Sequence, residues 1–158
     1  MPGPCKGPLW RIVLVLASLH AALVPAFGQQ VQSLVPSQQQ ERPASALARS
    51  IFQAIENGIL KGDVGTYAEH FAGQVQLNLR GDQGGYFSAR QAYYIMDNYF
   101  RTRKAANFHF STIADSEATP YATGSGTIVR KGTREVVQVY VLLGSSGERW
   151  TIAQLNIY

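Results

Sequence analysis

The segment VQVYVLLGSSGERWTIAQLNIY, residues 137–158, decides the fold class. Its two halves are rich in β-branched and aromatic residues, and the GSSGE between them has the composition of a turn, so the segment predicts a β-hairpin. Successive side chains of a strand point to opposite faces. One face of this hairpin is then almost entirely apolar, and we expect it to be buried against helices. Its residues are Val137, Val139, Val141, Leu143, Thr151, Ala153, Leu155 and Ile157.

The opposite face of the hairpin mixes polar and apolar side chains. Its residues are Val136, Gln138, Tyr140, Leu142, Trp150, Ile152, Gln154 and Asn156. This set is too apolar for a surface that faces only water, and sheet faces of this kind often meet a second subunit. We therefore expect a homodimer that forms through this outer sheet face.

Two helices and a strand are predicted upstream. Residues 45–63 have apolar side chains at helical spacing, with Ser45 as the expected N-cap. Asp63 is placed to cap a second, shorter helix over residues 64–71. Residues 73–80, GQVQLNLR, alternate strictly between polar and apolar and predict a strand with one wet face. The apolar positions of the first helix are Leu47, Ile51, Ile55 and Ile59, supported by Phe52.

The aromatic stretch GGYFSARQAYYIMDNYF, residues 84–100, predicts a turn followed by a helix. Ser88 and Gln91 have the spacing of a capping box, which marks the helix start. At 100° per residue most of the aromatic side chains fall on one face, so we interpret them as core, and Tyr94 is the exposed exception. The cations that follow are interpreted as a solvated helix C-terminus. They are Arg101, Arg103 and Lys104.

The rest of the chain reads as four strands separated by turn residues. With the helices before them, these strands predict an α+β fold in which a curved antiparallel sheet wraps around about three N-terminal helices. The predicted strands cover residues 107–114, 121–130, 134–143 and 149–158.

The N-terminus has the pattern of a cleaved secretory signal over residues 1–28. Lys6 and Arg11 precede an apolar run, and Ala26 and Gly28 supply the small residues of a cleavage site. Residues 29–43 are Gln-rich and predict a flexible linker, which leaves a domain over 44–158. We expect a periplasmic or secreted protein with no stable membrane anchor after cleavage; the alternative is an uncleaved anchor helix.

Composition excludes some classes of function. Cys5, the only cysteine, would leave with the signal, so the mature chain would have no disulfide and no thiol chemistry. Without Lys6 and Arg11, 12 of the 14 basic residues remain against 10 acidic ones. This balance has no basic stripe, so we expect no nucleic-acid partner.

Three segments resemble a known family. GGYFSARQAYYIMDNYF is similar to the G-x-Y-S-x-x-Q-A … F-F segment of a bacterial exported family, domain of unknown function 4783. VQVYVLLGSSGERWTIAQLNIY resembles its closing R-V-Y-I-L-L … I-x-x-L-R-I hairpin, and YATGSGTI stands at its Y-x-I-G-x-L. Phe87 is an insertion, and Asn156 replaces a common basic residue. The resemblance covers residues 45–158 and implies the nuclear transport factor 2-like (SnoaL-like, cystatin-like) cone. It implies no functional residue.

Sequence motifs indicate no cofactor and no metal site. His70 and His109 have no third ligand at a suitable spacing. The carboxylates are interpreted as caps, exposed residues or turn residues, which favours a non-catalytic domain. Those weighed are Asp63, Asp97, Asp115 and Glu117.

Three hypotheses for function remain. The favoured one is a non-catalytic exported domain that binds a small apolar ligand in the cone or an envelope partner. The second is a small-molecule isomerase or dehydratase on the same fold. The third is a polymer or nucleic-acid binder that uses Tyr94 with Arg90, Arg101 and Arg103. A tyrosine combines an apolar ring with a hydroxyl, so the candidate pocket residues are Tyr67, Phe71, Tyr93, Tyr99 and Tyr121.

Overall fold

The computed structural model describes residues 43–158, except 83, 116–117 and 148. The predicted signal peptide and all of the predicted linker but its last residue lie outside the described residues. The helical elements are α1 (Pro43–Lys61), the 3₁₀ turns η1 (Val64–Thr66) and η2 (Ala68–His70), and α2 (Ala89–Arg101). The strands are β1 (Phe71–Leu79), β2 (Gly84–Ser88), β3 (Lys104–Ala114), β4 (Tyr121–Arg130), β5 (Thr133–Ser146) and β6 (Arg149–Ile157).

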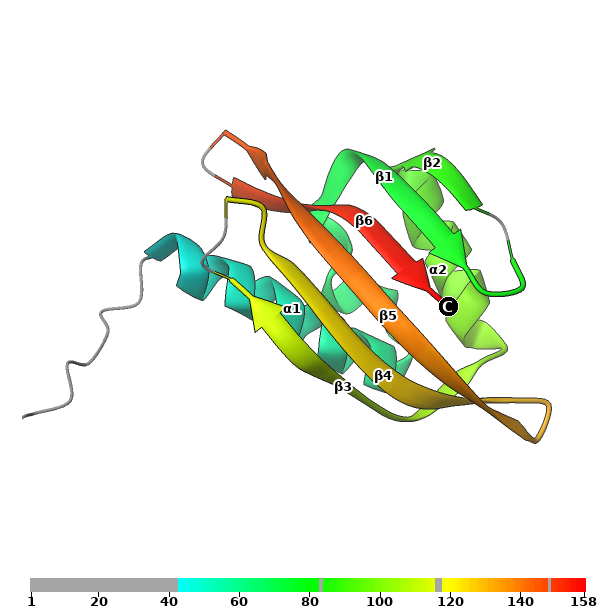
Figure 1. Cartoon of the computed structure of the whole chain (residues 1–158). Coiled ribbons are helices and arrows are strands. Elements are labelled where there is room, and N and C mark those ends of the chain that lie inside the picture. The colour runs from blue at the N-terminus through cyan, green and yellow to red at the C-terminus, as the bar shows by residue number, and fades with distance from the viewer. Residues whose placement is uncertain (1–42, 83, 116–117, 148) are drawn as a thin grey trace, which may run out of the picture. The chain divides into compact units, whose positions relative to one another are not determined.

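The strands form one sheet in the order β2-β1-β6-β5-β4-β3 (Figure 1). Neighbouring strands are antiparallel except β1 and β6, which are parallel. The prediction of an antiparallel sheet is therefore wrong at this pair. The last strand returns to the middle of the sheet and joins the β1–β2 hairpin to the β3–β5 meander.

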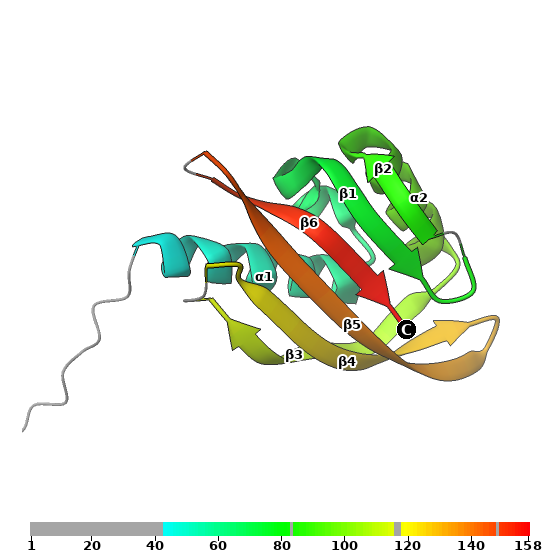
Figure 2. The same ribbon diagram turned by 45° about the horizontal axis from the view of Figure 1, so that its top comes forward.

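Both α-helices cover the same face of the sheet (Figure 2). α1 packs along β3, and α2 packs on β1 and β2. Buried side chains of both helices and of the sheet form one core. The predicted apolar stripe of α1 is confirmed at Ile51, Ile55 and Ile59, whereas Leu47 is exposed and Ala48 is buried in its place.

The predicted short helix over 64–71 is instead the two 3₁₀ turns η1 and η2, so the described residues contain two α-helices and not three. Asp63 does act as a cap, because its Oδ1 accepts a hydrogen bond from the Gly65 backbone at 3.0 Å. Ser45 is not a cap, since α1 already begins at Pro43.

The turn predicted before α2 is partly a strand. Residues 84–88 pair with β1 as β2, with Tyr86 opposite Gln76. The capping box is confirmed at the start of α2. Gln91 donates its backbone N–H to the Ser88 hydroxyl at 3.4 Å, and its side chain accepts from the Ser88 backbone at 3.0 Å.

A β-bulge changes which residues of the last hairpin are buried. Leu142 is opposite Gln154, but Leu143 is opposite Ile152, so the register shifts past Ala153. Ile152 is therefore fully buried in the core. Thr151 and Ala153, which we predicted on the buried face, turn to the outer side and are half-buried. Strict alternation fails where a strand carries an extra residue.

Candidate functional site

A large hollow of the described residues lies on the outer face of the sheet, opposite the helices. It is an open groove with a volume of about 680 Å³. We call it the outer groove. Its lining residues come from β3, β4, β5, β6 and the residue after β6: Ser111, Thr123, Gly124, Ser125, Gln138, Val139, Tyr140, Gln154, Asn156 and Tyr158.

Strand register brings these side chains together. Ser125 is opposite Gln138, and Tyr140 stands between Thr123 on one side and Asn156 on the other. Because side chains alternate along each strand, paired residues share one face of the sheet. The polar residues of three neighbouring strands therefore form a continuous surface that crosses the strands.

Asn156 is buried in the lining of the outer groove. The residue is only 3% exposed. Its Nδ2 donates a hydrogen bond to the hydroxyl of Tyr158 at 2.8 Å, while its Oδ1 is buried with no partner in the described residues. Buried side-chain polar atoms almost always have a partner, so this oxygen is an exception in the described residues.

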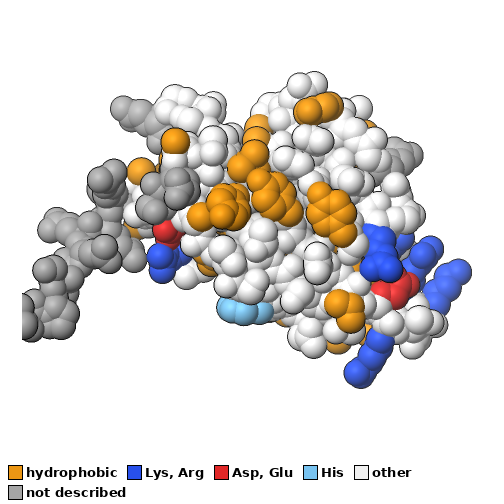
Figure 3. Space-filling model, viewed as in Figure 1, with side chains coloured by type: hydrophobic (Ala, Val, Ile, Leu, Met, Phe, Trp, Pro, Cys, Tyr) orange, Lys and Arg blue, Asp and Glu red, His pale blue; other side chains and the backbone are white. Residues whose placement is uncertain are grey.

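Tyrosine rings flank the polar residues. Tyr140 lines the outer groove and stacks on Tyr121, with ring centroids 6.2 Å apart and an interplanar angle of 26°. The backbone of Tyr158 is fixed by two hydrogen bonds to Gln138. Figure 3 views this face, where hydrophobic and aromatic side chains form a band beside uncharged polar ones and basic side chains gather at one end.

A small void lies between the helices and the sheet. The void found there has a volume of only about 10 Å³, and Tyr99, Phe100 and Phe108 are among its lining residues. A space of this size holds about one water molecule at most.

The structure separates the five candidate pocket residues. Tyr67 and Phe71 are buried and pack edge to face at 5.8 Å. Tyr99 is buried under the guanidinium of Arg103, 4.1 Å from its ring centre. Tyr93 is half-buried on α2, and Tyr121 is on the outer face. Among these five residues, only Tyr67 and Phe71 are in aromatic contact with each other. A pocket that all five share stays a prediction.

Burial also affects the two buried tyrosines chemically. Burial raises the pKa of Tyr67, and the negative charge of Asp63 adds to this rise. Burial raises the pKa of Tyr99 as well, and the positive charge of Arg103 opposes it. Neither hydroxyl has a hydrogen-bond partner in the described residues. Arg103 itself is buried, so its interpretation as a solvated helix end is wrong.

A search with protein-family profiles matched residues 52–158, most of the domain, to the family described as Domain of unknown function (DUF4783). The chain belongs to the DUF4783 family.

Solved structures support the fold of this DUF4783 domain. A DUF4783 family protein from Bacteroides uniformis is 13% identical, with a TM-score of 0.59 over 66% of this chain and 93% of that one. A ketosteroid isomerase-like protein from Erwinia carotovora is 14% identical, with a TM-score of 0.58 over 73% and 95%. A putative dehydratase from the NTF2-like family of Streptomyces avermitilis is 11% identical, with a TM-score of 0.53 over 72% and 93%. The domain has the α+β nuclear transport factor 2-like fold. No curated protein matches the sequence.

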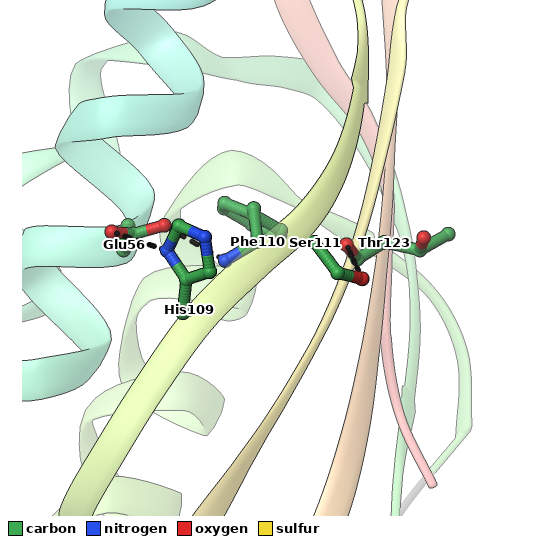
Figure 4. Close-up of polar contacts among 5 residues, drawn as sticks. All are labelled: Glu56, His109, Phe110, Ser111 and Thr123. Carbon is green, nitrogen blue, oxygen red and sulfur yellow. Dashed lines mark hydrogen bonds and ion pairs between the residues drawn. The ribbon is translucent and has the colours of Figure 1, made fainter.

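The described carboxylates and histidines of the DUF4783 domain lie outside the core. Within the described ranges, the buried polar or charged residues are Ser45, Arg103 and Asn156, without a carboxylate or histidine among them. His109 is exposed on β3, with its Nδ1 3.5 Å from Glu56 (Figure 4). Asp115 pairs with Arg49 at 2.6 Å. Glu117, weighed in the sequence analysis, lies outside the described residues.

The described part of the chain holds no group of three or more histidine, cysteine or acidic residues placed to bind a metal ion. It also has no helix that is both long and apolar enough to cross a membrane.

Proposed function

We propose that this DUF4783 domain is a non-catalytic binding domain and that the outer groove is its binding site. The observation that carries the proposal is the distribution of open space. The outer groove has about 680 Å³, whereas the void between helices and sheet has about 10 Å³. Ligand sites usually measure about 300–1,000 Å³, so of these two spaces the outer groove has the size of one.

The chemistry of the lining supports binding over catalysis. General acid–base catalysis needs a histidine, carboxylate or similar group within hydrogen-bond reach of the substrate. The outer groove is lined by hydroxyls, amides and backbone, and its tyrosines are its only titratable side chains. An isomerase or dehydratase in the interior is the alternative. It would need a carboxylate or histidine there, and the described carboxylates and histidines lie outside the core.

Nuclear magnetic resonance of isotope-labelled protein tests the proposal. Metabolites, lipids, saccharides and peptides are added in turn, and we expect a binding compound to shift the backbone amides of Ser125, Gln138 and Gln154. Ser125→Arg fills the outer groove and should abolish the shifts. Asn98→Arg, on the exposed side of α2, should leave them unchanged. Compounds that shift only the amides around Tyr67 and Tyr99 would overturn the proposal in favour of an interior site.

Homodimerisation through the outer sheet face is a second candidate function. Three large hydrophobic side chains are exposed on this face: Tyr86 at 66%, Val136 at 69% and Tyr158 at 52%. Exposed apolar groups gathered on one face favour a protein contact. We expect Val136→Arg to turn a dimer into a monomer in analytical ultracentrifugation, while Leu60→Arg on α1 has no effect. A wild-type protein that is monomeric at every concentration would remove this candidate.

A further inference from the structure

We propose that the ligand of the outer groove is a neutral, hydroxyl-rich saccharide chain. This inference rests on the proposed function, because it names the class of compound that the same site binds. It follows from the charge, the polarity and the aromatic rings of the lining.

The lining carries no formal charge. None of its ten residues is an aspartate, glutamate, lysine, arginine or histidine. A charged ligand that enters the groove loses hydration and gains no opposite charge in return. The outer groove therefore favours a neutral ligand.

The lining is also rich in hydrogen-bonding groups. Amides are supplied by Gln138, Gln154 and Asn156, and small hydroxyls by residues 111, 123 and 125. Ser111 already donates to the Thr123 carbonyl and Asn156 to the Tyr158 hydroxyl. An apolar ligand would cover the other groups and leave them without water as a partner, which costs the desolvation of each one. Small-molecule sites are usually lined mostly by apolar side chains, whereas this groove combines aromatic rings with many polar groups. A ligand with many hydroxyls fits it better than an apolar one.

The tyrosine rings supply flat surfaces for sugar rings. The face of an aromatic ring is electronegative. The C–H groups on one side of a pyranose ring carry a weak positive charge, so they pack against such a face. Tyr140 lies in the outer groove with Tyr121 stacked on it, and Tyr158 is half-exposed beside Asn156.

A peptide strand fits the outer groove less well. Peptides bind sheets mainly by adding a strand at an open edge, where backbone groups are free. β4, β5 and β6, which supply most of the lining, each have a strand on both sides. Recognition in the groove must then come from side chains, and these match hydroxyls and sugar rings.

Titration with neutral hexasaccharides tests the inference. The probes are maltohexaose, cellohexaose and hexa-N-acetylchitohexaose, with hexaglutamate, hexalysine and 1-octanol as charged and apolar comparisons. Each is added to the wild-type protein and to Val136→Arg, in which the outer face cannot be covered by a second copy. We expect at least one hexasaccharide to bind by calorimetry and to shift the groove amides, and the comparison compounds to do neither.

Variants of Tyr140 then test the contact itself. Loss of a central aromatic contact weakens binding by about tenfold or more, so Tyr140→Ala should raise the dissociation constant by that factor. Tyr140→Phe keeps the ring and should bind more tightly than Tyr140→Ala. Tyr94→Ala, which removes an exposed tyrosine from α2, should bind as the wild type does.

Two results would overturn the inference. If a peptide or octanol shifts the groove amides and no hexasaccharide does, the ligand class is wrong while the proposed binding site stands. If no hexasaccharide binds either protein and no compound of the wider screen shifts the groove amides, both the inference and the proposed function fail.

Discussion

Glu56 on α1 satisfies the open edge of β3 at Phe110. Its Oε2 accepts a hydrogen bond from the Phe110 backbone N–H at 2.8 Å (Figure 4). β3 is the last strand of the sheet, and its pairing with β4 shifts between Phe110 and Thr112. Backbone groups at an open edge can pair with another chain, and proteins avoid this by covering the edge. The Glu56 carboxylate serves that purpose here.

Removal of this carboxylate should weaken the fold. A hydrogen bond to a charged group contributes about 1.5–3 kcal/mol, so we expect Glu56→Ala to lower the free energy of unfolding by about 2 kcal/mol. Glu56→Gln keeps an acceptor and should lose less. Urea denaturation measures both. Glu69→Ala is the control, since that side chain is 80% exposed and should change stability by less than about 0.5 kcal/mol. Equal losses for Glu56→Ala and Glu69→Ala would contradict the role of Glu56.

Local patterns in the sequence predicted the parts of the fold that depend on neighbouring residues. The stripe of Ile51, Ile55 and Ile59 and the capping box of Ser88 and Gln91 follow from helical spacing alone. The same holds for the Asp63 cap, which bonds two residues along the chain. These features need no knowledge of distant parts of the chain.

The features that the sequence did not predict depend on distant contacts. The parallel pairing of β1 and β6 joins Leu77 to Leu155, and no local pattern records it. The bulge that buries Ile152 is set by the partner strand. The sequence predicts that Arg103 is a solvated residue at a helix end, but in the fold its guanidinium lies against the Tyr99 ring and near Asp82. The outer groove was missed for this reason, although the mixed face that contains Gln138, Tyr140, Gln154 and Asn156 was its signal.

The hydroxyl of Tyr67 should lower the free energy of unfolding. It is buried without a hydrogen-bond partner in the described residues, and an unsatisfied buried group costs about 1–3 kcal/mol. The ring itself must stay, because it packs on Phe71 and against Gly58. We therefore expect Tyr67→Phe to raise the free energy of unfolding by about 1 kcal/mol. Tyr94→Phe, whose hydroxyl is in water, should change nothing in the same urea titration. A loss of stability in Tyr67→Phe would mean that the hydroxyl has a partner.

Alkaline pH should widen the difference between wild type and Tyr67→Phe. Burial and the charge of Asp63 raise the pKa of Tyr67 above its ordinary value of 10.0. Above pH 10 the unfolded chain releases this proton and the folded chain keeps it, so the stability of the wild type falls as the pH rises. Phenylalanine has no such proton. The gap in unfolding free energy should grow by about 1.4 kcal/mol per pH unit above about pH 10. Parallel pH profiles for the two proteins would show that the pKa of Tyr67 is not raised.

Gly124 should tolerate no side chain, because the backbone of the neighbouring strand β3 lies too close to it. A Cβ at this position would lie 2.3 Å from the His109 carbonyl oxygen and 2.8 Å from the Phe110 Cα, both backbone atoms that cannot move alone. Overpacking usually costs about 1–3 kcal/mol, and we expect Gly124→Ala to reach or exceed the top of that range because the clash is with backbone. Gly73→Ala on β1 is the matched control, since a Cβ there meets nothing within 4 Å. Thermal unfolding followed by circular dichroism compares the two variants. A Gly124→Ala protein as stable as Gly73→Ala would mean that β3 can move away from β4, and with it Ser111 at the border of the outer groove.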